Sequence, residues 1–156
     1  MEPNSIQTAL AFAVEEVLET MCFTTVLSSA EGYAPPGPRS EAPAVAAELS
    51  FEGNLKDNPP GQFHVSLHRN VARMVAAGFL AREEAEVSEE QSEEVVCELA
   101  NMICGFVLSH LESRSTFRIS HPELASPEPG SVMENAGAGR WFDLGGGFLV
   151  ASLRLQ

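Results

Sequence analysis

The sequence predicts an α+β fold with a duplicated helix-plus-strands plan, and three observations lead to it. Two long segments, 5–21 and 89–111, carry apolar residues at helical spacing. Shorter segments that follow each of them read as strands, because apolar and polar residues alternate and turn residues separate them. A faint internal repeat also relates Glu16–Cys22 to Glu98–Cys104, one in each helical segment.

The first half is expected to form one helix and two strands. Asn4 or Ser5 can cap the helix, because a short polar side chain accepts a hydrogen bond from its free backbone N–H groups. The apolar face of this helix consists of Ile6, Leu10, Val14, Val17, Leu18 and Met21. A proline-rich connector at 34–38 excludes helix there. Segments 44–51 and 62–67 then read as strands joined by a turn rich in Gly, Asn and Pro.

The second half is expected to start with a short helix at 70–80 and to continue through an acidic stretch, 82–94, into the long helix. The inward side of the short helix consists of Val71, Met74, Val75 and Phe79. Ser88 and Gln91 have the spacing of a capping box, and the nearby carboxylates complement the positive end of the helix dipole. The acidic stretch is therefore explained by helix stability or, alternatively, by the binding of a partner.

Three segments after the long helix complete the predicted sheet, with a loop rich in Pro and Glu among them. These segments are 116–120, 139–144 and 148–155. The glycine clusters Gly137–Arg140 and Gly145–Gly147 read as turns, because a strand-like run and not a helix follows each one.

Size and charge narrow the possible classes of function. At 156 residues the chain fits one domain, 1–156, with a sizeable core. The net charge of −13 argues against nucleic acid and anionic membrane as partners, since both bind basic surfaces. No apolar run is long enough to span a bilayer, and the N-terminus lacks the features of a signal peptide, so cytoplasm is the expected compartment.

The cysteines and histidines are expected to be structural or solvated. The chain has three cysteines, all in helical apolar patterns, which predicts that no disulfide framework forms. His64 and His68 lie about 13 Å apart on a strand, too far to share a zinc ion. No metal site is predicted, and neither the Gly-x-Ser-x-Gly elbow nor the P-loop pattern occurs.

The best functional clue is a carboxylate and a carboxamide three residues apart on the long helix, Glu98 and Asn101. Residues at i and i+3 are neighbours on one helix surface, with Glu94 one turn before and Gly105 one turn after. The residues expected to face the core are Val95, Val96, Leu99, Met102, Ile103, Phe106, Val107 and Leu111. Asparagine lowers the stability of a helix by about half a kcal/mol relative to alanine. Asn101 therefore either has no particular significance or is present for a function. In the plain alternative, the pair only solvates an exposed face.

The string Glu98-Leu-Ala-Asn101-Met-Ile-Cys-Gly105 resembles the signature helix of the CheC/CheX/FliY family of chemotaxis phosphatases. In that helix Glu-x-x-Asn is followed by an apolar pair and then a glycine. The order of segments from about Ser5 to the C-terminus is similar as well. The resemblance implies a mixed, mainly antiparallel sheet of about six strands with two long pseudo-symmetric helices packed on it. It also implies a homodimer, made by sheet continuation or strand exchange through the C-terminal half.

The internal repeat is similar to one in this family, where CheC-like members carry the motif in both halves and CheX-like members in the second half only. Glu16 aligns with Glu98 and Cys22 with Cys104, but Glu19 stands in place of Asn101. The chain therefore resembles the CheX-like arrangement, with one candidate site.

The resemblance implies a phosphatase that hydrolyses the phospho-aspartate of a CheY-like response regulator. Asn101 would position the attacking water, and Glu98 would pair with a lysine of the regulator. Glu94 and Gly105 would contact the partner, the regulator would hold Mg²⁺, and this chain would bind no cofactor. One alternative is a non-catalytic response-regulator or flagellar-switch binding module of the same fold. Another is a small-molecule-binding domain, which no positive feature supports.

Overall fold

The computed structural model describes residues 3–35, 44–53, 60–112, 116–126 and 137–155, so most of the connector expected at 34–38 lies outside them. The helices are α1 (Pro3–Met21), α2 (Arg69–Leu80) and α3 (Glu89–Leu111), with a 3₁₀ turn, η1 (Glu84–Glu86), before α3. The strands are β1 (Ser28–Glu31), β2 (Ala44–Gly53), β3 (Gly61–His68), β4 (Phe117–Ile119), β5 (Glu123–Ala125), β6 (Gly137–Asp143) and β7 (Phe148–Leu155).

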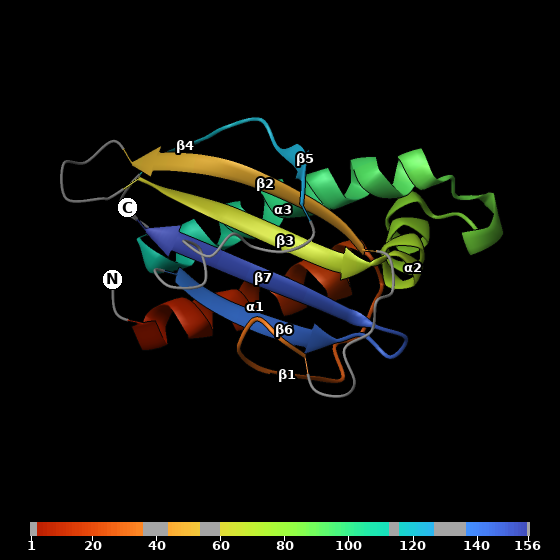
Figure 1. Ribbon diagram of the computed structural model, residues 1–156, viewed down its shortest axis with the longest axis horizontal. Helices are drawn as coiled ribbons and strands as arrows, with labels where there is room; N and C mark the ends of the chain where they lie inside the picture. Colours follow the sequence, from red (N-terminus) through yellow and green to blue (C-terminus); the bar gives the residue numbers. More distant parts are fainter. Residues whose placement is uncertain (1–2, 36–43, 54–59, 113–115, 127–136, 156) are drawn as a thin grey trace.

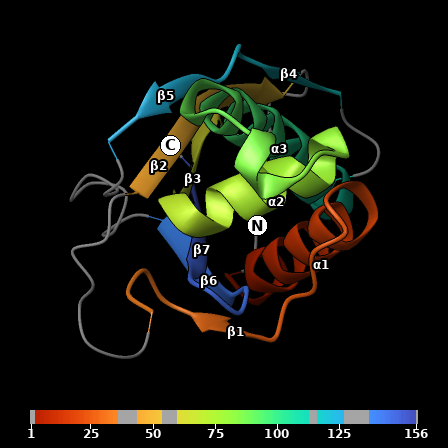
Figure 2. The ribbon, with the colours of Figure 1, turned by 90° about the vertical axis from the view of Figure 1, so that its right-hand side faces the viewer.

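These seven strands form one sheet, and the helices cover one of its faces (Figure 1). The strand order is β1-β6-β7-β3-β2-β4, and β5 pairs with β2 on the same side as β4. Every pairing between described strands is antiparallel. Figure 2 shows the two layers end-on, with the sheet on one side and the helices on the other. The architecture confirms the predicted α+β class and its mainly antiparallel sheet.

Helices α1 and α3 lie side by side on the sheet and run in opposite directions (Figure 1). When Glu16 is aligned with Glu98, most of their buried residues match, although Met21 is 44 % exposed where its counterpart Ile103 is buried. The matched pairs are Ala13 and Val95, Val14 and Val96, Val17 and Leu99, Leu18 and Ala100, and Cys22 and Cys104, each at most 3 % exposed. The two long helices are therefore pseudo-symmetric, as predicted.

The start of α1 differs from the sequence prediction. The helix begins at Pro3, so Asn4 and Ser5 lie inside the first turn and do not cap it. Proline is favoured at the first helical position, because the N–H group that it lacks would have no acceptor within the helix. Met21, predicted on the buried face, is 44 % exposed at the last position of the helix.

The sheet contains two strands that the sequence does not predict and one wrongly predicted turn. Strands β1 and β5 have only four and three residues, too few for a clear alternation, and they are defined by backbone pairing with β6 and β2. Gly137–Arg140 lies within β6 and is not a turn. Glycine suits this strand because a Cβ on Gly139 would come within 2.6 Å of the Tyr33 ring. Gly145–Gly147 do form the turn between β6 and β7.

Helix α3 is long and apolar enough to cross a bilayer by length and composition, which the sequence reading did not recognise. Its apolar residues other than Phe106 belong to the hydrophobic core that α1, α2 and the sheet share, or pack against it. Its outer face instead carries Glu94 and Glu98. The core helix of a folded domain can have the same length and composition as a membrane-spanning helix. The packing of α3 against the other helices and the sheet shows that it is a core helix.

Candidate functional site

Helix α3, which carries the candidate residues, is fixed at its start by the predicted capping box. The Gln91 N–H donates to Ser88 Oγ at 3.1 Å, and the Ser88 N–H donates to Gln91 Oε1 at 2.9 Å. Glu89 in the first turn forms an ion pair with Arg69 of α2. These contacts give part of the acidic stretch a structural role and hold the start of α3 against α2.

The four candidate residues share one face of α3. Glu94, Glu98 and Asn101 are exposed, and Gly105 is partly buried. Neither the Glu98 carboxylate nor the Asn101 carboxamide makes a hydrogen bond or ion pair within the described part of the chain. Both groups are therefore free to contact another molecule.

The residues beneath this face are buried as predicted, with one exception. The buried ones, each at most 3 % exposed, are Val95, Val96, Leu99, Ile103 and Val107, and Met102 and Leu111 are partly buried against the core. Phe106, predicted to face the core, is 45 % exposed. At 3.6 residues per turn, Phe106 lies only about 80° around the helix from Glu98, between the outer face and the core. The apolar spacing therefore placed it too far inward.

Gly105 leaves open space on this surface. A Cβ at this position would meet Ile119 Cδ1 at 4.0 Å, which is ordinary van der Waals contact. Packing among the described residues does not require glycine here, although glycine costs a helix interior about 1 kcal/mol relative to alanine.

The aligned positions of α1 form a different surface. Glu16 is partly buried and Glu19 is exposed, so α1 presents two carboxylates and no carboxamide. Phe12, one turn before Glu16, is 49 % exposed, and its ring stacks on His110 of α3 with centroids 5.3 Å apart. The sequence reading missed this contact, because no spacing along the chain links residues on two different helices.

The cysteines are free thiols, and none suits nucleophilic catalysis. Burial raises the pKa of Cys22 and the pKa of Cys104 to about 12. Burial is also the main cause of the raised pKa of Cys97, and the neighbouring carboxylates, Glu98 first among them, add to it. A raised thiol pKa keeps the reactive thiolate scarce at neutral pH.

The histidines of the sheet have structural contacts. His64 is 3 % exposed, and its Nε2 lies 2.8 Å from the Ser126 carbonyl oxygen. The Phe148 N–H donates to His68 Nδ1 at 3.4 Å. Among the residues that the structure describes, no three His, Cys, Asp or Glu side chains gather closely enough to hold a metal ion.

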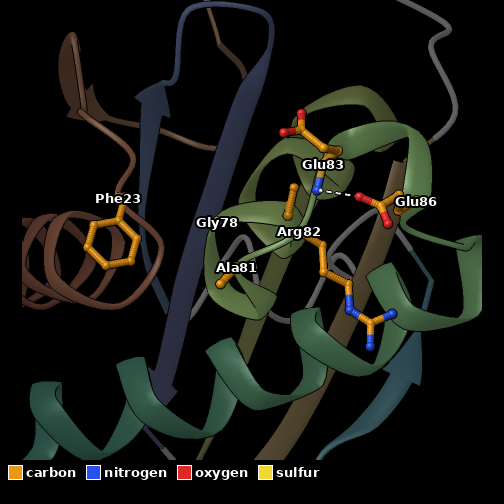
Figure 3. Close-up of a pocket in the computed structure, with 7 residues that line it drawn as sticks. Phe23, Gly78, Ala81, Arg82, Glu83 and Glu86 are labelled. Carbon is orange, nitrogen blue, oxygen red and sulfur yellow. Dashed lines mark hydrogen bonds between the residues drawn. The ribbon is translucent and has the colours of Figure 1, made fainter.

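An open pocket of about 500 Å³ lies where the ends of α1 and α2 meet (Figure 3). Its lining residues are Phe23, Ala77, Gly78, Ala81, Arg82, Glu83 and Glu86. Phe23 forms one wall and has a left-handed backbone, with φ 53°. The helices approach closely here, because a Cβ on Gly78 would overlap the Cys22 carbonyl oxygen. None of the four candidate residues of α3 lines this pocket.

Comparison with known proteins relates this arrangement to a family. The family model described as "Chemotaxis phosphatase CheX" matches residues 53–142, a range that contains all of α3. Among curated proteins, none matches the chain.

Solved structures share the fold over nearly their whole length. Chemotaxis protein CheX from Desulfovibrio desulfuricans is 17 % identical with a TM-score of 0.69, and 97 % of this chain and 99 % of that chain are covered. CheX from Vibrio vulnificus is 17 % identical with a TM-score of 0.71, and the coverage is again 97 % and 99 %. The CheX–CheY–BeF3–Mg complex from Borrelia burgdorferi is 18 % identical with a TM-score of 0.67, covering 96 % of this chain and 97 % of that one.

Proposed function

Because the chain belongs to the CheX family of chemotaxis phosphatases, we propose that it hydrolyses the phospho-aspartate of a CheY-like response regulator. The observation that carries this proposal is the free and exposed pair Glu98 and Asn101 on a helix that the core holds in place. The similar structure from Borrelia burgdorferi, which contains CheX and CheY together, supports a receiver protein as the partner.

The chemistry asks little of the phosphatase beyond positioning. A water molecule attacks phosphorus in line with the bond to the aspartyl oxygen, that bond breaks, and inorganic phosphate and a free carboxylate result. The proton that the water loses passes to solvent or phosphate. A carboxamide oxygen can accept a hydrogen bond from this water without bringing negative charge toward the phosphoryl group. Asn101 is the residue of α3 that fits this role.

The remaining candidate residues have docking roles. Glu98 pairs with a lysine of the regulator and fixes the register of binding, and it does not act as a base. Glu94 lies one turn before it on the same face, and Gly105 lets the partner backbone approach α3. Mg²⁺ belongs to the regulator in this proposal, with no metal or other cofactor bound by this chain. The protein acts in the cytoplasm as a homodimer.

The roles of Asn101 and Glu98 predict different failures for two alanine variants. Asn101→Ala should still bind a regulator that carries beryllofluoride, a stable phosphoryl mimic. Its activation free energy for dephosphorylation should be about two to four kcal/mol higher than that of wild type. Glu98→Ala should also weaken binding, and more strongly at low salt, because screening reduces the worth of the charge pair at high salt. The measurements are dephosphorylation rates and affinities for the same regulator at two salt concentrations.

The control is Gln62→Ala, at an exposed position on β3 in the sheet and away from the candidate residues of α3, which should leave both quantities unchanged. Equal activity of wild type and Asn101→Ala would contradict the enzymatic role. The non-catalytic binding module would then be the better account of the fold and its surface.

A further inference from the structure

Three exposed side chains from two helices lie near one another, on the flank of α3 that faces α1. We call Phe12, Phe106 and His110 the aromatic patch. Phe12 and Phe106 are 49 % and 45 % exposed, and His110 is exposed as well. The Phe12 ring stacks on His110 at 5.3 Å with 26° between the planes. Phe106 and His110 are four residues apart on α3, so they are neighbours on its surface.

The patch lies along α3 from the proposed catalytic pair. With a helical rise of 1.5 Å per residue, Phe106 is about 8 Å beyond Asn101 along the helix axis and His110 about 14 Å beyond it. Phe12 belongs to α1, the helix that packs beside α3, and its ring contacts His110. At 100° per residue, Phe106 lies about 140° around the helix from Asn101 and about 80° around it from Glu98, so the patch is on the flank of α3 away from Asn101. An interface of about 800 Å² per partner is wide enough to extend over the outer face of α3 from Asn101, past Glu98, to this flank.

Packing within the protomer does not account for the two phenylalanines. Single exposed apolar side chains are common on protein surfaces and need no explanation. Here one phenylalanine stacks on a histidine of the neighbouring helix, and a second phenylalanine lies one turn before that histidine. Aromatic side chains dominate the affinity of many interfaces. The stacked Phe12 ring also loses little conformational freedom on binding, because the stack already restricts it.

We propose that the aromatic patch is the apolar anchor for the receiver domain of the response regulator, an inference that rests on the proposed function. The matching regulator presents an apolar side chain that is displaced from its phospho-aspartate by about 8 to 14 Å along the axis of α3 and also sideways, toward α1. A regulator with a charged side chain at that place binds poorly, because the charge would be buried without a partner. The patch therefore selects among the regulators that the site serves.

The charges around the patch favour this occupant over a second copy of the chain. Glu16 lies one turn from Phe12 on α1, and Glu98 lies two turns from Phe106 on α3. Two copies that meet face to face through this surface would bring these carboxylates together, and like charges repel. A partner that combines apolar side chains with a lysine complements the surface.

The test compares Phe12→Ala and Phe106→Ala with wild type for binding of a CheY-like regulator activated with beryllofluoride and Mg²⁺. Each variant should raise Kd about tenfold, as the loss of an aromatic anchor does. The dephosphorylation rate at saturating regulator should stay within about twofold, because Asn101 and Glu98 are intact. Phe106→Leu should recover most of the affinity. The control is Leu27→Ala, an equally apolar, 64 % exposed residue whose N–H bonds Asp143 at the sheet edge, and it should change nothing.

Two results would overturn the inference. One is an unchanged Kd for both phenylalanine variants in proteins that melt at the wild-type temperature. The other is a change of oligomeric state in Phe106→Ala, measured by sedimentation, because the patch would then cover a second copy. Wild type that binds the activated regulator without dephosphorylating it would refute the proposed function alone, since the effect of the variants on Kd would still decide the role of the patch. Wild type that binds no regulator in the panel would refute both.

Discussion

Ser152 is fully buried on β7, and its hydroxyl has no hydrogen-bond partner among the described residues. Thr24, in contrast, has a buried hydroxyl that is hydrogen-bonded, because it donates to the Cys22 carbonyl oxygen at 3.1 Å. Because an unpaired buried hydroxyl is destabilising, Ser152→Ala should raise the free energy of unfolding by about 1 kcal/mol. Thr24→Val should lower it by about the same amount, because it removes a bond that is made. Denaturant titration of both variants is the measurement, and a loss of stability in Ser152→Ala would contradict the argument.

Single residues were predictable from the sequence where the helical phase is strong. The exposure of Glu98 and Asn101 follows from the buried Val95, Leu99 and Ile103 around them. The exposure of Phe106 was not predictable, because it depends on where α1 lies relative to α3. Whether Glu98 and Asn101 act as proposed stays a prediction.

Helix α1 tests the difference between the two halves. Its Glu16 and Glu19 align with Glu98 and Asn101. If α1 docked on a regulator in the same way, these two carboxylates would be repelled by the phosphoryl group and the acidic pocket of the regulator. The double variant Glu16→Ala and Glu19→Ala should therefore keep nearly all phosphatase activity. The measurement is the dephosphorylation rate beside that of Asn101→Ala. A large loss in a folded double variant would mean that α1 carries a second functional surface.

Whole elements were predictable in proportion to their length and to the strength of their local signals. Helix α3 starts where Ser88 and Gln91 predict it, because the capping box is a local arrangement. Strands β2, β3 and β7 also lie close to their predicted bounds. Strands β1 and β5 depend on backbone pairing with residues far along the chain, and such pairing leaves no pattern in three or four residues.

The sheet edges bear on the assembly of the whole molecule. Strands β6 and β7 have neighbours on both sides, so sheet continuation through the C-terminal half would use β4 and β5. Leu124 of β5 is 51 % exposed at this edge, whereas Leu27 precedes β1 at the opposite edge. We expect a homodimer in solution, with about twice the chain mass of 16.7 kDa in sedimentation equilibrium.

Leu124→Lys should dissociate this dimer, because a charge on an edge strand opposes pairing with another sheet, and Leu27→Lys should not. Dissociation should also make the melting temperature of wild type depend on protein concentration. A wild-type protein that sediments as a monomer at every concentration would contradict the homodimer. Dissociation by Leu27→Lys alone would place the interface at the β1 edge.

The matched burial of α1 and α3 has a consequence for protein engineering. Most core-facing residues of α1 match those of α3, so the outer positions of α1 can be exchanged with little effect on packing. Glu19→Asn would supply a carboxamide at the same spacing from Glu16 as Asn101 has from Glu98. Phe23→Gly would put glycine where the backbone already has a positive φ. A second Glu-x-x-Asn sequence, followed by a glycine at the spacing of Gly105, is thus two surface substitutions away.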